Sequence, residues 1–185
     1  MLEGQNVILR LFAEADLDEY LSLANQYSQR GEYFPIVPRN PSETRKKFAE
    51  TGWWDEHEGR LLITDKEGRM LGDIGFFKSS PYQTGYELGY SIYRREDRGK
   101  GYMSEALRLF SAYLFELKPI PRLYLHTSAD NEASRKVAEK CGYKYEGTMR
   151  QAAFLRGTYH DCPWFSLLRE DCPTLPELLR KRGRS

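Results

Sequence analysis

The sequence lacks several features that mark specialised classes of protein. It has only three cysteines, Cys141, Cys162 and Cys172, and their odd number without CxxC spacing argues against both a disulfide framework and a zinc site. We expect three free thiols. No apolar run reaches the roughly 18 residues that a membrane span needs, and the opening MLEGQNVILRLF lacks the basic and apolar regions of a signal peptide. These absences predict no membrane contact and a cytoplasmic location.

The sequence also lacks an excess of charge of either sign. Its 28 Lys and Arg residues nearly balance 27 Asp and Glu residues, so neither a broad basic surface for nucleic acid nor an acidic tail is indicated. A length of 185 residues suits one domain with a sizeable core, at about 100 to 200 residues per domain. We expect a single domain over residues 1–185 and a partner that is a small molecule or a short peptide.

Several motifs with defined chemistry are missing. The Walker pattern GxxxxGK[ST] is absent, GxGxxG fails at Ser104, and no GxSxG elbow supports a serine hydrolase. His160, Asp161 and Cys162 are adjacent in a predicted strand, where neighbouring side chains face opposite ways, so we expect no metal site. We expect Trp53 and Trp54 to lie in the core and at the rim of a helix that ends near Glu58. We do not expect them to form a platform on which nucleic-acid bases stack.

Periodicity predicts a mixed chain of strands and helices. A helix begins at Pro41 after an Asn40 cap and ends near Glu58, and an amphipathic helix runs from the glycines to Leu117, before Pro119. Three consecutive strands between them are expected to be antiparallel. Strands are predicted at 5–12, 60–80 (two), 84–94, 122–128, 143–150 and 158–170, and helices at 14–28, 41–58, 102–117, 131–141 and 175–185.

The stretch RGKGYMSEA places Gly99 and Gly101 directly before the amphipathic helix. A helix N-terminus presents backbone N–H groups and the positive end of a dipole, and glycines let an anion such as a phosphate approach them. The alternative is that the two glycines only make a tight turn. Residue spacing alone leaves both interpretations open.

The context of the glycines resembles a known family. YELGYSIY, RGKGYMSEA and NEASRKVAEKCGYKYEG are similar to the acetyl-CoA-binding core of the GNAT superfamily of N-acetyltransferases, here at about residues 84–147. ILRLF, GDIGFF and YHDCPWFSLLRE resemble its RimJ/RimL branch, which acetylates protein N-termini. The resemblance implies an α/β (α+β) fold. Its twisted sheet is mixed but mostly antiparallel, with about seven strands and four or five helices, and is splayed between the fourth strand (about 85–93) and the fifth (about 122–128).

The resemblance assigns the cofactor contacts. Backbone N–H groups grip the CoA pyrophosphate, and Asn131 contacts the cofactor arm, a role compatible with a plain N-cap. Many members carry Gln or Arg where this chain has Glu96, and we expect the backbone grip to tolerate that difference. The implied N–H groups belong to Arg98, Gly99, Lys100, Gly101, Tyr102 and Met103.

The proton transfers have competing candidates. Direct acetyl transfer, through a tetrahedral intermediate, needs a deprotonated amine. His126 is our first choice as base, because it lies five residues before Asn131, where some N-terminal acetyltransferases place a His or Glu. Glu87 is the alternative base, or it orients the acceptor ammonium. The Tyr that many relatives use to stabilise the leaving thiolate is replaced by Ala138, and Ser134 is our substitute.

The acceptor amine is the least determined part. By position in the family, Tyr33, Phe34 and Tyr159 surround the acceptor together with Glu87. The branch favours the α-amine of a protein or peptide, whereas a small-molecule amine such as a polyamine or antibiotic is the alternative. A third hypothesis, motivated by Ala138, is a non-catalytic module that binds acetyl-CoA. A homodimer is left open.

Overall fold

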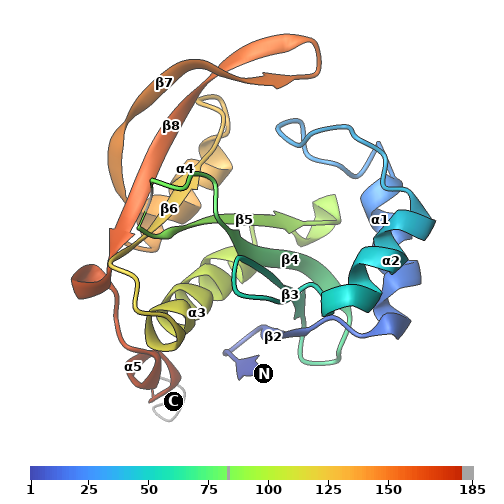
Figure 1. Ribbon diagram of the computed structural model, residues 1–185, viewed down its shortest axis with the longest axis horizontal. Coiled ribbons are helices and arrows are strands. Elements are labelled where there is room, and N and C mark those ends of the chain that lie inside the picture. Colours follow the sequence, from blue (N-terminus) through green and yellow to red (C-terminus); the bar gives the residue numbers. More distant parts are fainter. Residues whose placement is uncertain (83, 181–185) are drawn as a thin grey trace.

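Strands and helices follow one another largely in the predicted order (Figure 1). The structure is a computed structural model that describes residues 1–82 and 84–180. The strands are β1 (Leu2–Glu3), β2 (Ile8–Leu11), β3 (Glu58–Thr64), β4 (Met70–Phe77), β5 (Tyr86–Ile92), β6 (Arg122–His126), β7 (Lys144–Leu155) and β8 (Thr158–Leu168). The α-helices are α1 (Leu17–Asn25), α2 (Pro41–Thr51), α3 (Tyr102–Leu117), α4 (Glu132–Lys140) and α5 (Leu175–Arg180). The last five residues of the predicted terminal helix lie outside the described residues.

The described strands form one sheet in the order β1-β2-β3-β4-β5-β6-β8-β7. Every neighbouring pair is antiparallel except β5 and β6, which are parallel. The sheet has eight strands where the resemblance implied about seven, because the two-residue strand β1 also pairs with β2. A strand this short shows no alternation of side chains from which to predict it. Within the described ranges, none of the helices combines the length and apolar character that a membrane crossing demands.

The sheet opens between its two parallel strands, as expected. β5 and β6 are in register only at Tyr86 with Leu123 and at Glu87 with Tyr124. Beyond these pairs β5 continues to Ile92 and β6 to His126 without facing each other. The edge of β5 that faces β6 therefore keeps backbone N–H and C=O groups that no strand pairs with, and such groups need another partner.

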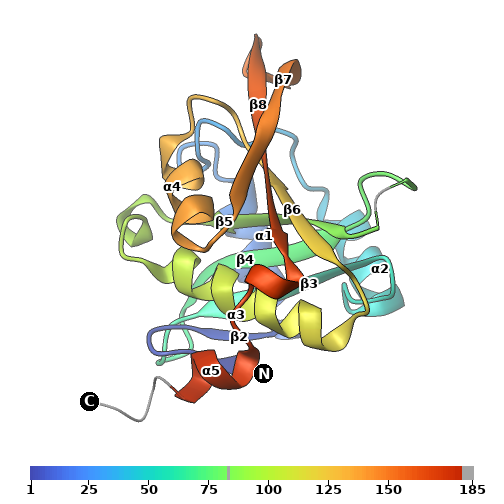
Figure 2. The same ribbon diagram turned by 90° about the vertical axis from the view of Figure 1, so that its left-hand side faces the viewer.

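The two faces of the sheet are covered by different helices (Figure 2). Leu61 and Ile63 of β3 point into the larger core, which α3 dominates and α4 and α5 extend. Leu62, between them, points to the other face and packs with Tyr20 of α1. This alternation on one strand is the period-two pattern of a sheet buried on both sides. It leaves α1 and α2 over β2 to β4, with the split at β5 and β6 beside them.

The end of α2 differs from the prediction. The helix ends at Thr51 and not near Glu58, because Gly52 adopts a left-handed C-cap with φ +63°. Trp53 then also takes a positive φ of 57°, and its ring packs between Phe12 and Phe48. The expectation that both tryptophans lie on this helix is therefore wrong. Both follow the end of the helix, and Trp54 forms an isolated antiparallel β-bridge with Gly59.

Candidate active site

The glycine loop joins the 3-10 turn after β5 to the start of α3. Gly99 and Gly101 have φ angles of +75° and +86°, in the left-handed region that glycine adopts most readily. A Cβ atom on either residue would meet no atom within 4 Å. The loop is thus both a tight turn and an accessible stretch of backbone, so the two interpretations of the sequence are compatible.

The N–H groups of the loop differ in whether the protein already uses them. The N–H of Arg98 already donates to the carbonyl of Arg95 at 3.1 Å. The N–H groups in the first turn of α3 have no acceptor within the helix, and no described hydrogen bond engages those of the glycine loop. Among the N–H groups predicted to bind a phosphate, those without a described partner belong to Gly99, Lys100, Gly101, Tyr102 and Met103.

The two residues directly before the glycines tie this loop to other segments of the protein. Asp97 is 2% exposed and accepts hydrogen bonds from both terminal guanidinium nitrogens of Arg69, in the β3–β4 turn, at 2.8 and 2.9 Å. The hydrogen bonds from Arg69 lower the pKa of Asp97. The guanidinium of Arg98 donates to the carbonyl of Gln29 at 2.6 Å, which ties the loop to the segment after α1. The bare backbone is therefore held in place before any ligand arrives.

The two rival candidates for the base form a pair at the point where β5 and β6 separate. Oε1 of Glu87 lies 2.6 Å from Nδ1 of His126. Glu87 is buried, with 3% of its surface exposed, whereas 40% of the His126 side chain is exposed. Both project from the face of the sheet opposite to the α3 core, because Leu88 and Leu125 beside them point into that core.

Glu87 raises the pKa of His126 and orients its ring. Its hydrogen bond raises the pKa of His126, against the opposing effect of partial burial. The ring of His126 also stacks on Trp164 of β8, with centroids 5.0 Å apart and planes 22° apart. These contacts occupy Nδ1 and one ring face. They leave Nε2 without a partner among the residues that the structure describes, and an imidazole nitrogen held this way can accept a proton.

A second polar pair lies on the opposite side of the split, where α4 begins. The hydroxyl oxygens of Tyr90 on β5 and Ser134 are 2.9 Å apart. Asn131 caps α4 by accepting the N–H of Ser134 at 3.1 Å, so its side-chain amide N–H groups remain available to a ligand. Burial raises the pKa of Tyr90 to about 12, which keeps the phenol protonated at neutral pH. Sequence reasoning selected Ser134 and missed Tyr90.

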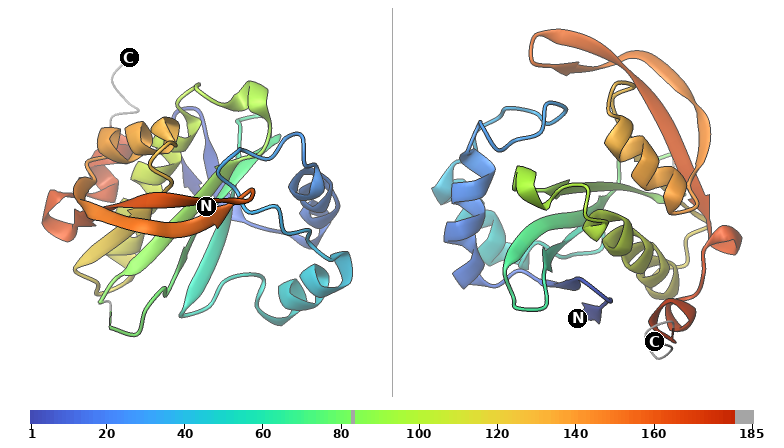
Figure 3. Two further views of the ribbon diagram at one scale, coloured as in Figure 1. Left: turned by 90° about the horizontal axis from the view of Figure 1, so that it is seen from above. Right: turned by 180° about the vertical axis from the view of Figure 1, so that it is seen from behind.

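The predicted acceptor contacts are spread over two segments that rise on either side of the split (Figure 3). Tyr33, in the loop after α1, donates its hydroxyl to the carbonyl of Asp130 at 2.9 Å, and Phe34 beside it is 41% exposed. Tyr159 of β8 is 64% exposed and packs on Phe154 of the same hairpin. Strand alternation turns Tyr159 to the face opposite Trp164, whereas the hydroxyl of Tyr33 reaches the segment before α4.

The hairpin formed by β7 and β8 and the loop after α1 also contact each other. The guanidinium of Arg156 at the hairpin tip donates to the hydroxyl of Tyr27 at 2.8 Å and lies over its ring. Lower on the hairpin, His160 Nδ1 lies 3.1 Å from a carboxylate oxygen of Asp130. Among the residues described, no three His, Cys, Asp or Glu side chains gather to hold a metal ion.

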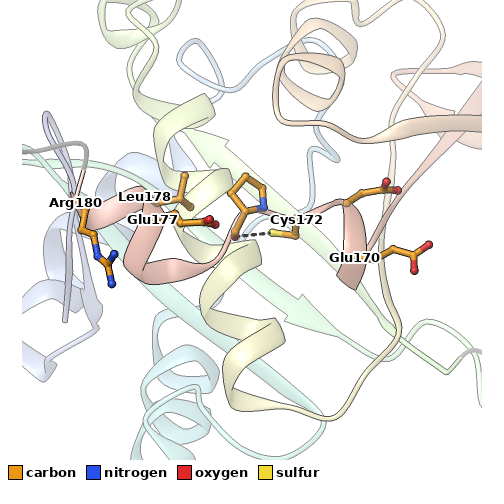
Figure 4. Close-up of a pocket in the computed structure, with 7 residues that line it drawn as sticks. Glu170, Cys172, Glu177, Leu178 and Arg180 are labelled. Carbon is orange, nitrogen blue, oxygen red and sulfur yellow. Dashed lines mark hydrogen bonds between the residues drawn. The ribbon is translucent and has the colours of Figure 1, made fainter.

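A separate hollow lies at the C-terminal end, away from this site (Figure 4). It measures about 610 Å³ and is bordered by the turn after β8 and by α5, including Glu170, Cys172 and Arg180. Figure 4 shows these side chains spread along the segment, with Cys172 directed at the carbonyl of Pro173. Burial raises the pKa of Cys172 to about 11, so its thiolate is scarce at neutral pH and we assign no chemistry to this hollow.

Comparison with known proteins agrees with this geometry. Residues 6–144 match the acetyltransferase (GNAT) domain family. YdaF of Bacillus subtilis (strain 168), provisionally named a ribosomal N-acetyltransferase, is 27% identical over 176 residues, which cover 91% of this chain and 94% of that protein. Spermidine N-acetyltransferase from Vibrio cholerae, solved with CoA and spermine, superposes with a TM-score of 0.77 at 21% identity over 89% of this chain and 96% of its own. RimL, the ribosomal L7/L12 α-N-protein acetyltransferase solved with CoA, gives a TM-score of 0.74 at 24% identity over 89% of this chain and 95% of its own.

The chain belongs to the GNAT acetyltransferase family. It is an acetyl-CoA-dependent N-acetyltransferase of the RimJ/RimL type, and this sets aside the hypothesis of a non-catalytic binding module. The open N–H groups of the glycine loop and the unpaired edge of β5 suit the pyrophosphate and the arm of acetyl-CoA. Sequence reasoning missed Trp164 and Tyr90, and only their alternation within predicted strands hinted that either side chain faces the split.

Proposed function

We propose that this enzyme acetylates the α-amine at the N-terminus of a protein or peptide. The supporting observation is that three carboxylates around the split already have partners within the protein. Glu87 is paired with His126, Asp130 with His160, and Glu146 with Arg122. None of these three carboxylates is left for a polycation such as spermidine, whereas a peptide brings a single amine and needs no acidic cluster.

His126 acts in this proposal as the base. Nδ1 is held by Glu87 and the ring is held by Trp164, so Nε2 takes the proton of the acceptor ammonium, directly or through one water. Glu87 keeps the ring oriented and stabilises the imidazolium that forms. The two candidates therefore act as one unit, with Glu87 as the positioning residue.

The remaining groups act on the other side of the split. Acetyl-CoA supplies the thioester carbonyl that the amine attacks and the thiolate that leaves. A backbone N–H on the free edge of β5 polarises the carbonyl oxygen. The hydroxyls of Tyr90 and Ser134 hydrogen-bond the developing thiolate and supply its proton. Asn131 and the glycine loop hold the arm and the pyrophosphate.

Release of CoA thiol by the purified enzyme tests the acceptor. The panel contains peptides with free N-termini, the same peptides N-acetylated but with a free lysine side chain, spermidine, and amine-bearing antibiotics. We expect turnover of the free peptides and none of the N-acetylated ones, which separates α-amines from ε-amines. Turnover of spermidine or an antibiotic without turnover of any peptide would overturn the proposal.

A further inference from the structure

An exposed glycine interrupts β5 at the level of His126. Gly89 lies in the middle of the strand, yet it is exposed, whereas the three residues before it are buried. From the register pair of Glu87 with Tyr124, β5 and β6 each run on for two positions, to Gly89 and to His126. Strand alternation opens Gly89 to the same face as Glu87, opposite the α3 core. Gly89 and His126 therefore lie on opposite sides of the split, at the same level.

The usual structural reasons for a glycine do not apply to Gly89. Its φ is not positive. On the adjacent strand β4, a Cβ on Gly72 or Gly75 would lie 2.0 or 2.7 Å from a backbone oxygen of a neighbouring strand, so the packing of the sheet requires both. Among the described residues beyond its chain neighbours, a Cβ on Gly89 would approach only Cε1 of Phe77, at 3.4 Å. Glycine weakens the interior of a strand and often marks a place where a ligand approaches closely. The missing Cβ thus points to a molecule that binds beside it.

The face to which Gly89 opens is that of the acceptor. The next side chain along β5, Tyr90, points the other way and reaches Ser134 of α4, on the side of the glycine loop and the cofactor. Gly89 opens to the side where Glu87 holds His126. An acceptor with its α-amine at Nε2 of His126 carries its first side chain on the adjacent carbon. That side chain is then the group that reaches Gly89 across the split.

The side chains around Gly89 favour an apolar group. The facing residues of β4 and β5 on this side are Phe77 with Glu87, Gly75 with Gly89, and Asp73 with Ser91. Both oxygens of the Asp73 carboxylate are engaged, one by the hydroxyl of Ser91 at 3.0 Å and the other by Arg60 at 3.3 Å. Phe77 is 37% exposed, and its ring edge borders the space that Gly89 leaves. With the nearby carboxylates engaged and an aromatic edge uncovered, this space suits an apolar side chain better than a charged one.

We propose that Gly89 determines which first residue the enzyme acetylates, because its missing Cβ makes room for an apolar side chain beside the reacting α-amine. The inference rests on the proposed function and deepens it, since it names the class of peptide. The side chain packs on the backbone of Gly89 and against the ring of Phe77. Peptides that begin with Leu or Met are then better acceptors than peptides that begin with Gly or Ala.

The kinetic test uses amidated tripeptides that differ only in their first residue, which is Gly, Ala, Asn, Leu or Phe. Asn is close to Leu in size and tests polarity. In the wild type we expect kcat/KM to be on the order of tenfold higher for Leu than for Ala or Asn, from the burial of the added apolar surface. In Gly89→Ala the new methyl group occupies the space, so the ratio between Leu and Ala falls about tenfold. The Gly peptide, which has no side chain to place there, should keep its kcat/KM within about twofold.

Two further variants separate this role from a structural one. Phe77→Ala widens the space, so the ratio of kcat/KM between the Phe and Leu peptides should rise. Gly89→Ala should unfold at a urea concentration no lower than that of the wild type, because the described chain leaves room for the methyl group. Gly75→Ala is the matched control on the adjacent strand. It should unfold at a lower urea concentration, because its Cβ would lie 2.7 Å from a backbone oxygen.

A binding measurement locates the acceptor side chain without turnover. The full-length enzyme with CoA is saturated with the N-acetylated Leu tripeptide amide, which is the product of the Leu peptide. We expect nuclear Overhauser contacts between the leucine methyl groups and the α-protons of Gly89, one of which stands in the place of the missing Cβ. Contacts from the same methyl groups to the ring protons of Phe77 are also expected.

The outcomes separate this inference from the proposed function. An unchanged ratio between the Leu and Ala peptides in Gly89→Ala, or no Overhauser contact to Gly89 at saturation, would overturn the role of Gly89. A loss of acetyl-CoA affinity in Gly89→Ala would also overturn it, by assigning the glycine to the cofactor. Peptide turnover in these cases still supports the proposed function. If no peptide is acetylated, the proposed function fails, and the Overhauser measurement still decides whether Gly89 contacts an acceptor side chain.

Discussion

Nδ1 of His126 lies 2.6 Å from Oε1 of Glu87, across the point where strands β5 and β6 separate. In the proposed mechanism, this contact joins the two alternative bases into one unit with a division of roles. The imidazole is half-exposed and keeps one free nitrogen, whereas the carboxylate is buried and already engaged.

Replacing His126 should impair chemistry without impairing cofactor binding. In His126→Ala the base is lost, so we expect the acetylation rate to fall by a factor on the order of 100 or more. The affinity for CoA, measured by calorimetry, should stay within about twofold of wild type, because the glycine loop is untouched. A variant that retains the full rate would show that His126 is not the base.

Replacing Glu87 should move the pH profile. The carboxylate raises the pKa of His126, so the neutral base of the wild type accumulates only above that raised value. In Glu87→Gln the pKa of His126 falls, and the acidic limb of kcat/KM shifts to lower pH. The rate at high pH should also drop as the ring loses its orientation. A limb that keeps its position would contradict the pairing and leave Glu87 a structural residue.

A side chain at Gly101 should weaken cofactor binding. Gly101→Leu places a Cβ in the open space beside the N–H groups and strains a residue with φ +86°. Gly68→Leu is the matched control, since Gly68 has φ +88°, also faces open space, and lies in the β3–β4 turn. Both variants should lose about 1–2 kcal/mol of unfolding free energy. Only Gly101→Leu should bind CoA at least tenfold more weakly, and equal affinities in the two would exclude the loop as the pyrophosphate site.

The hydroxyl pair at the start of α4 should act on the thiol of CoA. We expect Tyr90→Phe and Ser134→Ala each to slow acetylation about tenfold and to raise the pKa of the bound CoA thiol, followed by its thiolate absorbance. Tyr143→Phe is the control, because Tyr143 forms a similar pair with Ser111, 2.8 Å apart, within the core. Should the thiol pKa be the same in wild type and in Tyr90→Phe, the pair has no role toward the thiolate.

The anchor of the glycine loop should show in stability against pH. Hydrogen bonds from Arg69 depress the folded-state pKa of Asp97, so its contribution is present above the unfolded value of about 3.9 and is lost as pH falls through the folded value. Asp97→Asn should lower the unfolding free energy by about 2 kcal/mol at pH 7, measured by urea denaturation. That deficit should shrink toward pH 3. A deficit independent of pH would point to packing and not to charge.

Local signals were sufficient for most of the fold. The periodicity from Met103 to Leu117 predicted α3, and the alternation from Tyr86 to Ile92 predicted β5. Both patterns depend only on residues that are close together in the sequence. The prediction for α2 was wrong at its end, since the left-handed turn at Gly52 and the ring contacts of Trp53 overrode a continuing polar pattern. The split in the sheet and the use of acetyl-CoA were predicted from the resemblance to the family, which the comparison confirmed.

The sequence by itself predicted which residues would carry chemistry: the two glycines before a helix, His126 and Glu87 on separate strands, and Ser134 after a capping Asn. Only the tertiary structure decided how they combine. It joined Glu87 to His126 and placed Tyr90 against Ser134. The physical reason is that these contacts join residues on different elements, where sheet order and strand register set the distance and no local spacing in the chain records it.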